Sequence, residues 1–259
     1  MSKMITEYYE SGAIKSETPF KDGQKEGLAR KYYESGAIKD EVPFKEGILD
    51  GLFKSYYESG VLKNEVPYKD GRADGVAREY YENGAIEKEV PCQDGNREGL
   101  VKIYYGNGKL KIEMPFTEDK QEGLVKRYHE NGTLEADMSY KDDRADGPSK
   151  EYYESGAIEK ETPYKDGKQE GLAKVYYENG SLKVQIPYKE GKIEGRVEIY
   201  REDGELLSTN EFKDNSPVQG LRREADGSET PWTEAEIADF IKALDKARMK
   251  SRETHRRRR

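Results

Sequence analysis

A period of 24 residues runs through most of the chain and restricts the folds that it can adopt. Glycines recur at this interval from Gly12 to Gly204, and an aliphatic residue lies two positions after each one, from Ile14 to Leu206. The copies follow one another without an insertion, which indicates a stack of equivalent units rather than a conventional globular domain. The most regular column holds tyrosine in all nine copies: Tyr8, Tyr32, Tyr56, Tyr80, Tyr104, Tyr128, Tyr152, Tyr176 and Tyr200.

Each copy predicts two short strands. In the copy that starts at Gly27, the first strand covers Leu28–Tyr33, and the turn that follows places Gly36 where a positive φ is required. The second strand covers Ile38–Phe44, with apolar residues at even spacing on one face. The stretch Lys45–Gly51 then closes the next hairpin.

Stacked hairpins of this kind predict an all-β repeat protein. Two strands per copy at about 4.8 Å each advance the array by roughly 10 Å, so nine copies give an elongated, twisted single antiparallel sheet of stacked β-hairpins with roughly eighteen strands. The column of first tyrosines and the column of Ile14 and Ile38 are expected to form its core. The predicted organisation is nine tandem repeats over residues 4–215, a polar linker over 216–231, a helix over 232–250 and a basic disordered tail over 251–259.

The expected C-terminal helix has a clear start. Thr233 and Glu236 have the spacing of a capping box, and Trp232 with Ile237 fits a hydrophobic staple. Two interpretations remain open: this amphipathic α-helix covers the exposed end of the sheet, or it contacts a partner or a membrane together with the basic residues that follow. The residues predicted to make the contact are Trp232, Ile237, Phe240, Ile241 and Leu244.

The charge distribution disfavours nucleic acid as a partner. The chain carries 45 basic and 53 acidic residues, a net charge of −8. Residues 221–259 contribute 11 basic and 8 acidic residues, which leaves residues 1–220 with 34 against 45, a net charge of −11. An acidic body is not expected to grip phosphates or anionic lipid. Specific nucleic-acid binding is therefore not expected, and membrane binding is not favoured.

Composition also indicates whether the chain folds and in which compartment it is expected. Charged residues make up 38% of the chain, a value that alone would indicate disorder, but 20 tyrosines indicate that surface is buried. Cys92 is the only cysteine, which excludes an intramolecular disulfide and a multi-cysteine metal site. The first residues lack the apolar stretch of a signal peptide, and a cytoplasmic location is expected.

No catalytic constellation is evident, so the protein is expected not to be an enzyme and to need no cofactor or metal. His129 and Cys92 stand in columns that are otherwise aromatic and are interpreted as altered packing positions. An acidic residue recurs beside a turn glycine, and we expect it to bond turn amides rather than to act in acid–base chemistry. This acidic row contains Glu26, Asp50, Asp74, Glu98, Glu122, Asp146, Glu170 and Glu194.

The second residue of each tyrosine pair is the candidate partner-binding surface. This column admits His129 and Arg201, which indicates partial exposure, and exposed tyrosine ladders favour protein binding. The competing interpretation is that these rings only seal the second face of the sheet. The predicted binding column is Tyr9, Tyr33, Tyr57, Tyr81, Tyr105, His129, Tyr153 and Tyr177.

The unit Tyr-Tyr-Glu-Asn-Gly, followed by Pro-Tyr-Lys-Asp-Gly and Glu-Gly-Leu, resembles the bacterial variant of the MORN repeat, which is also found in antitoxin-component-like proteins. The resemblance covers residues 4 to about 214 and implies a β-hairpin ribbon with a non-enzymatic interaction role. The leading hypothesis is a protein–protein interaction scaffold or binding module. The alternatives are an antitoxin or immunity-type protein that neutralises a toxin, and a membrane-associated scaffold that uses the C-terminal helix. Another protein is thus the expected partner, and the chain is expected as a monomer or an end-to-end dimer.

Overall fold

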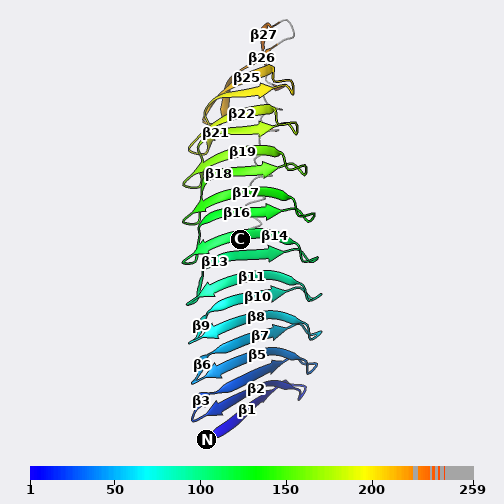
Figure 1. Cartoon of the computed structure of the whole chain (residues 1–259), viewed down its shortest axis with the longest axis vertical. Coiled ribbons are helices and arrows are strands. Elements are labelled where there is room, and N and C mark those ends of the chain that lie inside the picture. The colour runs from blue at the N-terminus through cyan, green and yellow to red at the C-terminus, as the bar shows by residue number, and fades with distance from the viewer. Residues whose placement is uncertain (224–226, 234, 237–238, 240–241, 243–259) are drawn as a thin grey trace. The chain divides into compact units, whose positions relative to one another are not determined.

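The structure, a computed structural model, describes residues 1–223, 227–233, 235–236, 239 and 242. The chain divides into two compact units, Met1–Arg144 and Ala145–Arg259, which are treated separately below. In both units the assigned elements are strands paired antiparallel to their neighbours along the chain (Figure 1). The predicted all-β fold of stacked hairpins in an open antiparallel sheet is confirmed within each unit. Among the described residues, no helix has the length and apolar character to cross a membrane.

The first unit contains six complete hairpins, from blue to green in Figure 1. Each of the first five hairpins is followed by a two-residue strand that pairs with the end of the hairpin and leads into the next one. The strands are β1 (Ser2–Tyr8), β2 (Ile14–Lys21), β3 (Gln24–Lys25), β4 (Gly27–Tyr32), β5 (Ile38–Lys45), β6 (Ile48–Leu49), β7 (Gly51–Tyr56), β8 (Leu62–Lys69), β9 (Arg72–Ala73), β10 (Gly75–Tyr80), β11 (Ile86–Gln93), β12 (Asn96–Arg97), β13 (Gly99–Tyr104), β14 (Leu110–Thr117), β15 (Lys120–Gln121), β16 (Gly123–Tyr128) and β17 (Leu134–Lys141).

The second unit continues the same pattern for three hairpins and then departs from it. Its last strands, β26 and β27, form a further antiparallel pair after the ninth hairpin. The strands are β18 (Arg144–Tyr152), β19 (Ile158–Lys165), β20 (Lys168–Gln169), β21 (Gly171–Tyr176), β22 (Leu182–Lys189), β23 (Lys192–Ile193), β24 (Gly195–Tyr200), β25 (Leu206–Lys213), β26 (Ser216–Arg223) and β27 (Glu229–Pro231).

The register of one hairpin shows how the two faces of the sheet arise. In the second copy, Ala29 of β4 lies opposite Val42 of β5, and Arg30 lies opposite Glu41. Successive side chains of a strand point to opposite faces, while directly opposed residues share a face. We call the face of Ala29, Val42 and Phe44, with the equivalent residues of other copies, the apolar face. The face of Arg30, Glu41 and their equivalents is the polar face.

Glycine is required at turns and where a neighbouring side chain approaches the backbone closely. Gly36 has a φ of +86°, which confirms the expected left-handed position in the turn between β4 and β5. Gly75 has a φ of +118°, and a Cβ there would lie 2.8 Å from Cγ of Pro67. The opposite turns contain two residues: Asp22 and Gly23 have φ values of +51° and +89° between the paired Lys21 and Gln24, the geometry of a type I′ turn.

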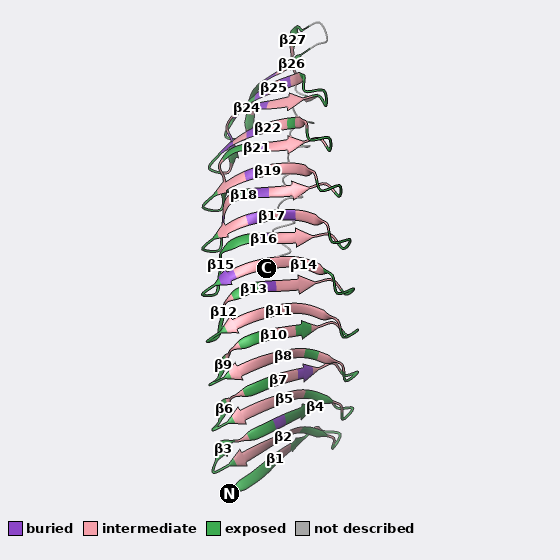
Figure 2. Cartoon of the chain, in the orientation of Figure 1, coloured by how far each residue is buried: buried purple, intermediate pink, exposed green. Residues whose placement is uncertain are grey.

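The core lies on the apolar face and not in the columns expected from sequence. Ile14 and Ile38 are 40% and 37% exposed, and Tyr8 is 62% exposed, so the prediction that these residues are core is wrong. They lie at the ends of strands beside the turns, where a single-layered sheet offers few neighbours. Figure 2 marks buried positions within the strands. The buried apolar side chains of the first unit include Ala29, Val101, Phe116, Val125, Ala136 and Met138.

The C-terminal region differs from its predicted organisation. Residues 216–231, expected to be a polar linker, contain β26 and β27. Of the predicted helix contacts, Trp232 is described, whereas Ile237, Phe240, Ile241, Leu244 and the tail 251–259 lie outside the described residues. The helix expected over 232–250 therefore lies largely outside the described residues. Its predicted capping box is present: the Thr233 amide donates to Glu236 Oε2 at 2.8 Å, and the Glu236 amide donates to Thr233 Oγ1 at 3.3 Å.

Candidate functional site

The second tyrosine column links one copy to the next. The hydroxyl of Tyr33 donates to the carbonyl of Tyr56 at 2.7 Å, and the Lys39 ammonium lies 5.5 Å from the centre of the Tyr33 ring. These rings are half-buried, with one polar end and one ring face already in contact with the protein. The column thus contributes to the stacking, and its role in binding a partner stays a prediction. The same hydroxyl–carbonyl bond is made by Tyr9, Tyr57, Tyr81, Tyr105, Tyr153 and Tyr177 at 2.6–2.9 Å.

His129, the predicted site residue that is not a tyrosine, keeps the backbone geometry of its column. Its amide donates to the carbonyl of Thr133 at 2.9 Å, and its carbonyl accepts from the Gly132 amide at 2.8 Å. The equivalent Tyr105 makes the same two bonds, to Lys109 and from Gly108. The turn is therefore set by the glycine and the main chain, which explains why the column can vary in its side chain.

The first tyrosine column lies on the polar face and is bonded to carboxylates of the preceding copy. Tyr80 donates to Glu65 at 2.8 Å, and Tyr104 donates to Glu89 at 2.8 Å. Arg78 joins the two carboxylates, with Nη1 at 3.1 Å from Glu65 and Nε at 3.0 Å from Glu89. Each polar group of this set already has a partner of its own, as expected for a structural network.

These contacts shift the pKa values of the groups in ways that keep the network intact. Burial, and secondly the hydrogen bond to a carboxylate, raises the pKa values of Tyr56, Tyr80 and Tyr104 to about 12. The hydrogen bond from Tyr104, together with Arg78, lowers the pKa of Glu89 below its ordinary value. At neutral pH the tyrosines hold their protons and Glu89 is ionised, which suits hydrogen bonding rather than proton transfer.

The acidic row serves the turns, as predicted from sequence. Glu26 accepts a hydrogen bond at 2.7 Å from the amide of Glu46, the first residue of the next two-residue turn. The row thus contributes a contact between copies, because seven of its eight carboxylates, all except that of Asp74, bond a turn amide 20 residues further along the chain. The other acceptors are Asp50, Glu98, Glu122, Asp146, Glu170 and Glu194, at 2.6–3.3 Å from Asp70, Glu118, Asp142, Asp166, Glu190 and Asp214.

Cys92 lies on the apolar face in the column of Phe20 and Phe44. Its thiol is half-buried, with Sγ 3.7 Å from the carbonyl oxygen of Val90. Burial raises the pKa of the thiol above its ordinary value. A raised thiol pKa leaves little thiolate at neutral pH, and the position therefore has the properties of a packing site rather than of a nucleophile.

The apolar face of the first two copies is open and hollowed. A hollow of about 550 Å³ lies over β1, β2, β4 and β5, and Ile5 in it is 39% exposed. Lys25 places its ammonium 4.7 Å from the centre of the Phe44 ring, and Lys31 pairs with Asp40 at 3.7 Å. The floor is apolar, and the charged residues of the lining are four cations, Lys15, Lys25, Arg30 and Lys31, and one carboxylate, Glu7. The lining includes Ile5, Thr18, Phe20, Ala29, Val42 and Phe44.

One cross-strand pair on the apolar face varies between copies, and the tyrosine columns gave no indication of it. We call it the variable pair: it is Glu7 with Ser16 in the first copy and the equivalent residues elsewhere. Comparing the copies at the position of Glu7 and at the position of Ser16 would have identified the variable pair from the sequence. The pairs are polar at Lys31–Asp40, Ser55–Asn64, Glu79–Lys88 and Glu151–Lys160, mixed at Arg127–Ala136 and Ile199–Ser208, and apolar at Ile103–Ile112 and Val175–Val184.

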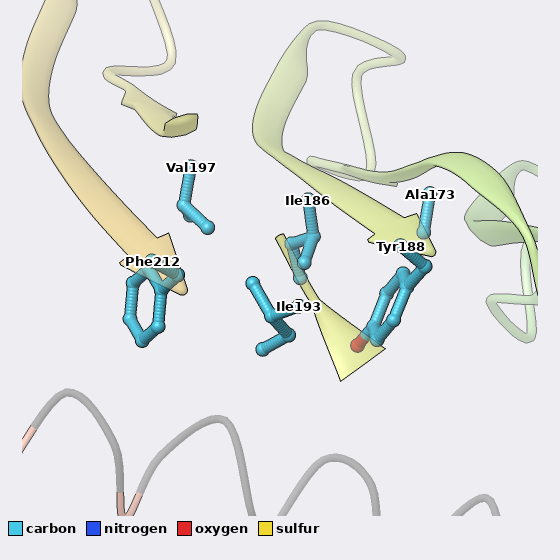
Figure 3. Packing of buried hydrophobic residues seen from close by; sticks show 6 residues of the cluster. All are labelled: Ala173, Ile186, Tyr188, Ile193, Val197 and Phe212. Atoms are coloured by element: carbon cyan, nitrogen blue, oxygen red, sulfur yellow. The ribbon is translucent and has the colours of Figure 1, made fainter. Parts of the chain in front are cut away.

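The apolar face of the eighth and ninth copies, β21–β22 and β24–β25, holds a buried cluster (Figure 3). Val197 is 0% exposed, Ile193 is 2% exposed and Phe212 is 3% exposed. Val184 of the variable pair packs against this cluster. The column that is exposed at Ile5 in the first copy is fully buried at Val197 in the ninth. The cluster consists of Ala173, Ile186, Tyr188, Ile193, Val197 and Phe212.

Comparison with known proteins gives one extensive match. A family model described as MORN repeat variant matches residues 5–22, 25–46, 49–70, 73–93, 97–118, 121–142, 145–166 and 169–190. No curated protein matches the sequence. The ninth hairpin lies outside the matched ranges, in agreement with the irregular residues Arg201 and Asn210 in its sequence.

Solved structures resemble the chain only weakly. Crystal structures of TcdB2-TccC3 and TcdB2-TccC3-Cdc42 match 85% and 89% of this chain at 9% and 10% identity, each with a TM-score of 0.21. This chain spans 14% of the length of each of those chains. A porin-like protein from Bacteroides uniformis ATCC 8492 matches 89% of this chain and 93% of its own at 13% identity, with a TM-score of 0.20. At these scores the likenesses carry no argument about fold or function.

Proposed function

Because the chain belongs to the MORN repeat variant family, we propose that it is a non-catalytic protein-binding module that uses the apolar face of its first copies. The hollow of about 550 Å³ over β1, β2, β4 and β5 supports this proposal, since it offers exposed apolar surface on ordered strands. The functional groups described above are already bonded within the sheet. The apolar face is the part of this region that offers unfilled contact area.

The chemistry of the hollow defines the kind of partner that fits. Phe20, Phe44 and Ile5 suit a segment with apolar side chains, and the rim cations Lys15 and Lys25 suit carboxylates beside them. The proposed partner is therefore a protein segment that combines apolar anchors with acidic flanks. The narrower role of toxin neutralisation stays a prediction, which co-expression with a candidate toxin would test.

The proposal is tested with two matched substitutions in the full chain. Ile5 on the apolar face is 39% exposed and Leu52 on the polar face is 42% exposed, so lysine at either position should leave the fold intact. A partner captured by the wild-type protein should be captured equally by Leu52→Lys and at least tenfold less by Ile5→Lys. Circular dichroism checks the fold of both variants. Equal capture by all three proteins, or equal loss in both variants, would reject this face as the binding surface.

A further inference from the structure

The apolar face of the last two copies is buried more deeply than a single sheet layer provides. Val197 and Ala173 are both 0% exposed, and the large side chains of Tyr188 and Phe212 are 7% and 3% exposed. Side chains on an uncovered sheet face stand perpendicular to the sheet and keep their outer ends in water. Burial of whole aromatic rings on this face therefore indicates a second layer, and Phe116 of the fifth copy, at 7% exposed, is buried to the same degree as Tyr188.

Within the second unit, the sequence of the face becomes more apolar from the seventh copy to the eighth. The variable pair is charged in the seventh copy, at Glu151 and Lys160, and apolar in the eighth, at Val175 and Val184. In the ninth copy Ile199 takes the first position. Exposure of apolar side chains at these positions to water would be unfavourable, and their burial under an apolar cover is favourable.

The chain itself returns to this face after β27. Gly220 lies opposite Asn210 of the apolar face, and a Cβ on Gly220 would lie 3.3 Å from Cβ and Cγ of Trp232. The Trp232 amide donates to the Gly220 carbonyl at 3.0 Å. Trp232 therefore lies over the glycine, on the same face as Asn210, and the missing side chain at Gly220 makes room for it.

The next described residues remain on that face. Arg222 lies opposite Ser208, which is 2% exposed on the apolar face, and its Nη1 donates to Glu236 at 2.8 Å. Glu236 and Thr233 form the capping box, so the hydrogen bonds that open a helix are made at this point. Residue 237 thus follows directly from a position fixed beside the ninth copy.

From these observations we propose that the C-terminal segment 237–250 is the second layer, packed along the apolar face of the eighth and ninth copies. Its apolar residues Ile237, Phe240, Ile241 and Leu244 have the spacing of one helical stripe. A helix of this length is about 21 Å long, and four strands at about 4.8 Å each present a face about 19 Å wide. The length of the segment thus matches the width of the face, and its apolar stripe matches the apolar side chains of the face. The segment is thus a built-in occupant of the face, and the inference does not depend on the partner proposed for the first copies.

A photo-crosslinking experiment in the full chain tests the placement. Phe240 is replaced by p-benzoylphenylalanine, irradiated, and the crosslinked residues are assigned by mass spectrometry. Crosslinks should fall on apolar-face residues such as Val184, Ile186 and Ile199. The matched control carries the same group at Lys242, which is exposed, and should not label these residues.

A substitution in the face gives a second readout. Ile199→Lys should reduce the yield from position 240 at least fivefold, whereas Leu172→Lys, at a 43% exposed position of the polar face, should leave it unchanged. Mixtures of isotopically light and heavy protein separate crosslinks within one chain from crosslinks between two. Labelling of the polar face, labelling of a second copy, or no labelling of the repeats would each overturn the proposal, whatever the stability of Ile199→Lys.

Discussion

The apolar face of the first copies and that of the last two copies share a backbone but differ in chemistry. In the second copy the variable pair is an ion pair, Lys31 with Asp40, while in the eighth it is Val175 with Val184. The strand register around both pairs is the same. The difference indicates that glycines, tyrosines and turn acids specify the stack, while two residues per copy set the chemistry of the apolar face. Four predictions test this division between residues of the stack and residues of the face, from the largest expected effect to the smallest.

A charge placed in the same column should be far more harmful in the ninth copy than in the first. Val197→Asp would bury an unpaired carboxylate at a position that is 0% exposed, with an expected loss of about 4 kcal/mol or more. Ile5→Asp, in the same column at 39% exposure, should change stability by less than about 1 kcal/mol. Urea unfolding followed by circular dichroism measures both. Similar losses for the two variants would show that the faces do not differ in cover.

Exchange of the variable pairs should have effects of very different size in the two regions. Val175→Lys with Val184→Asp puts charges beside the buried cluster and should destabilise the protein by about 2–4 kcal/mol. Lys31→Val with Asp40→Val removes an exposed ion pair, which contributes about 0–1 kcal/mol, and should leave the stability nearly unchanged. The midpoint of thermal unfolding reports both. A larger loss of stability in Lys31→Val with Asp40→Val than in Val175→Lys with Val184→Asp would contradict the assigned difference between the two regions.

The polar face should respond to alkaline pH through its tyrosine network. Tyr56, Tyr80 and Tyr104 have pKa values raised to about 12 from an ordinary value near 10. A raised pKa means that the folded state holds protons more tightly, so this contribution is complete below pH 10 and is lost as pH rises from about 10 to 12. Stability should therefore fall in this window.

Absorbance at 295 nm, which reports tyrosinate, checks the assignment. In the folded protein a fraction of the tyrosines should ionise about two pH units later than in 8 M urea, where all should ionise near pH 10. Tyr80→Phe, which keeps the ring and removes one of the late hydroxyls, serves as the control. Ionisation of every tyrosine near pH 10 while the circular dichroism spectrum is unchanged would contradict the network.

The smallest expected effect concerns an irregular residue of the ninth copy. Asn210 is 2% exposed, and its Nδ2 has no hydrogen-bond partner among the described residues. The same column holds Val42, Val66 and Ile186 in other copies. Asn210→Val should therefore stabilise the protein by about 1 kcal/mol, seen as a rise of a few degrees in the unfolding midpoint. A fall in the midpoint would show that the amide contributes a contact that valine cannot replace.

Much of the fold could be predicted from the sequence because its determinants are local and recur. The interval of 24 residues, the strand lengths and the left-handed turn at Gly36 follow from short-range sterics and alternation. The role of Glu26 and its equivalents at turn amides followed from the same reasoning and is confirmed. The capping box of Thr233 and Glu236 is a further local pattern that the structure contains.

The position of the core was decided only by the tertiary structure. The uniform Tyr8 and Ile14 columns indicated a core, yet Tyr8 and Ile14 are exposed in the first copy and the equivalent residues from the third copy onward are only half-buried. The uniformity of these columns comes instead from bonds between copies and from turn geometry. The less uniform column of Ala29, Val101 and Val197 is the buried one. Which face is covered depends on what packs against it, and that is a contact between segments distant in sequence. The sequence by itself determined the repeated unit, and only the contacts of Trp232 and Glu236 with Gly220 and Arg222 of β26 pointed to a cover for the apolar face of the ninth copy.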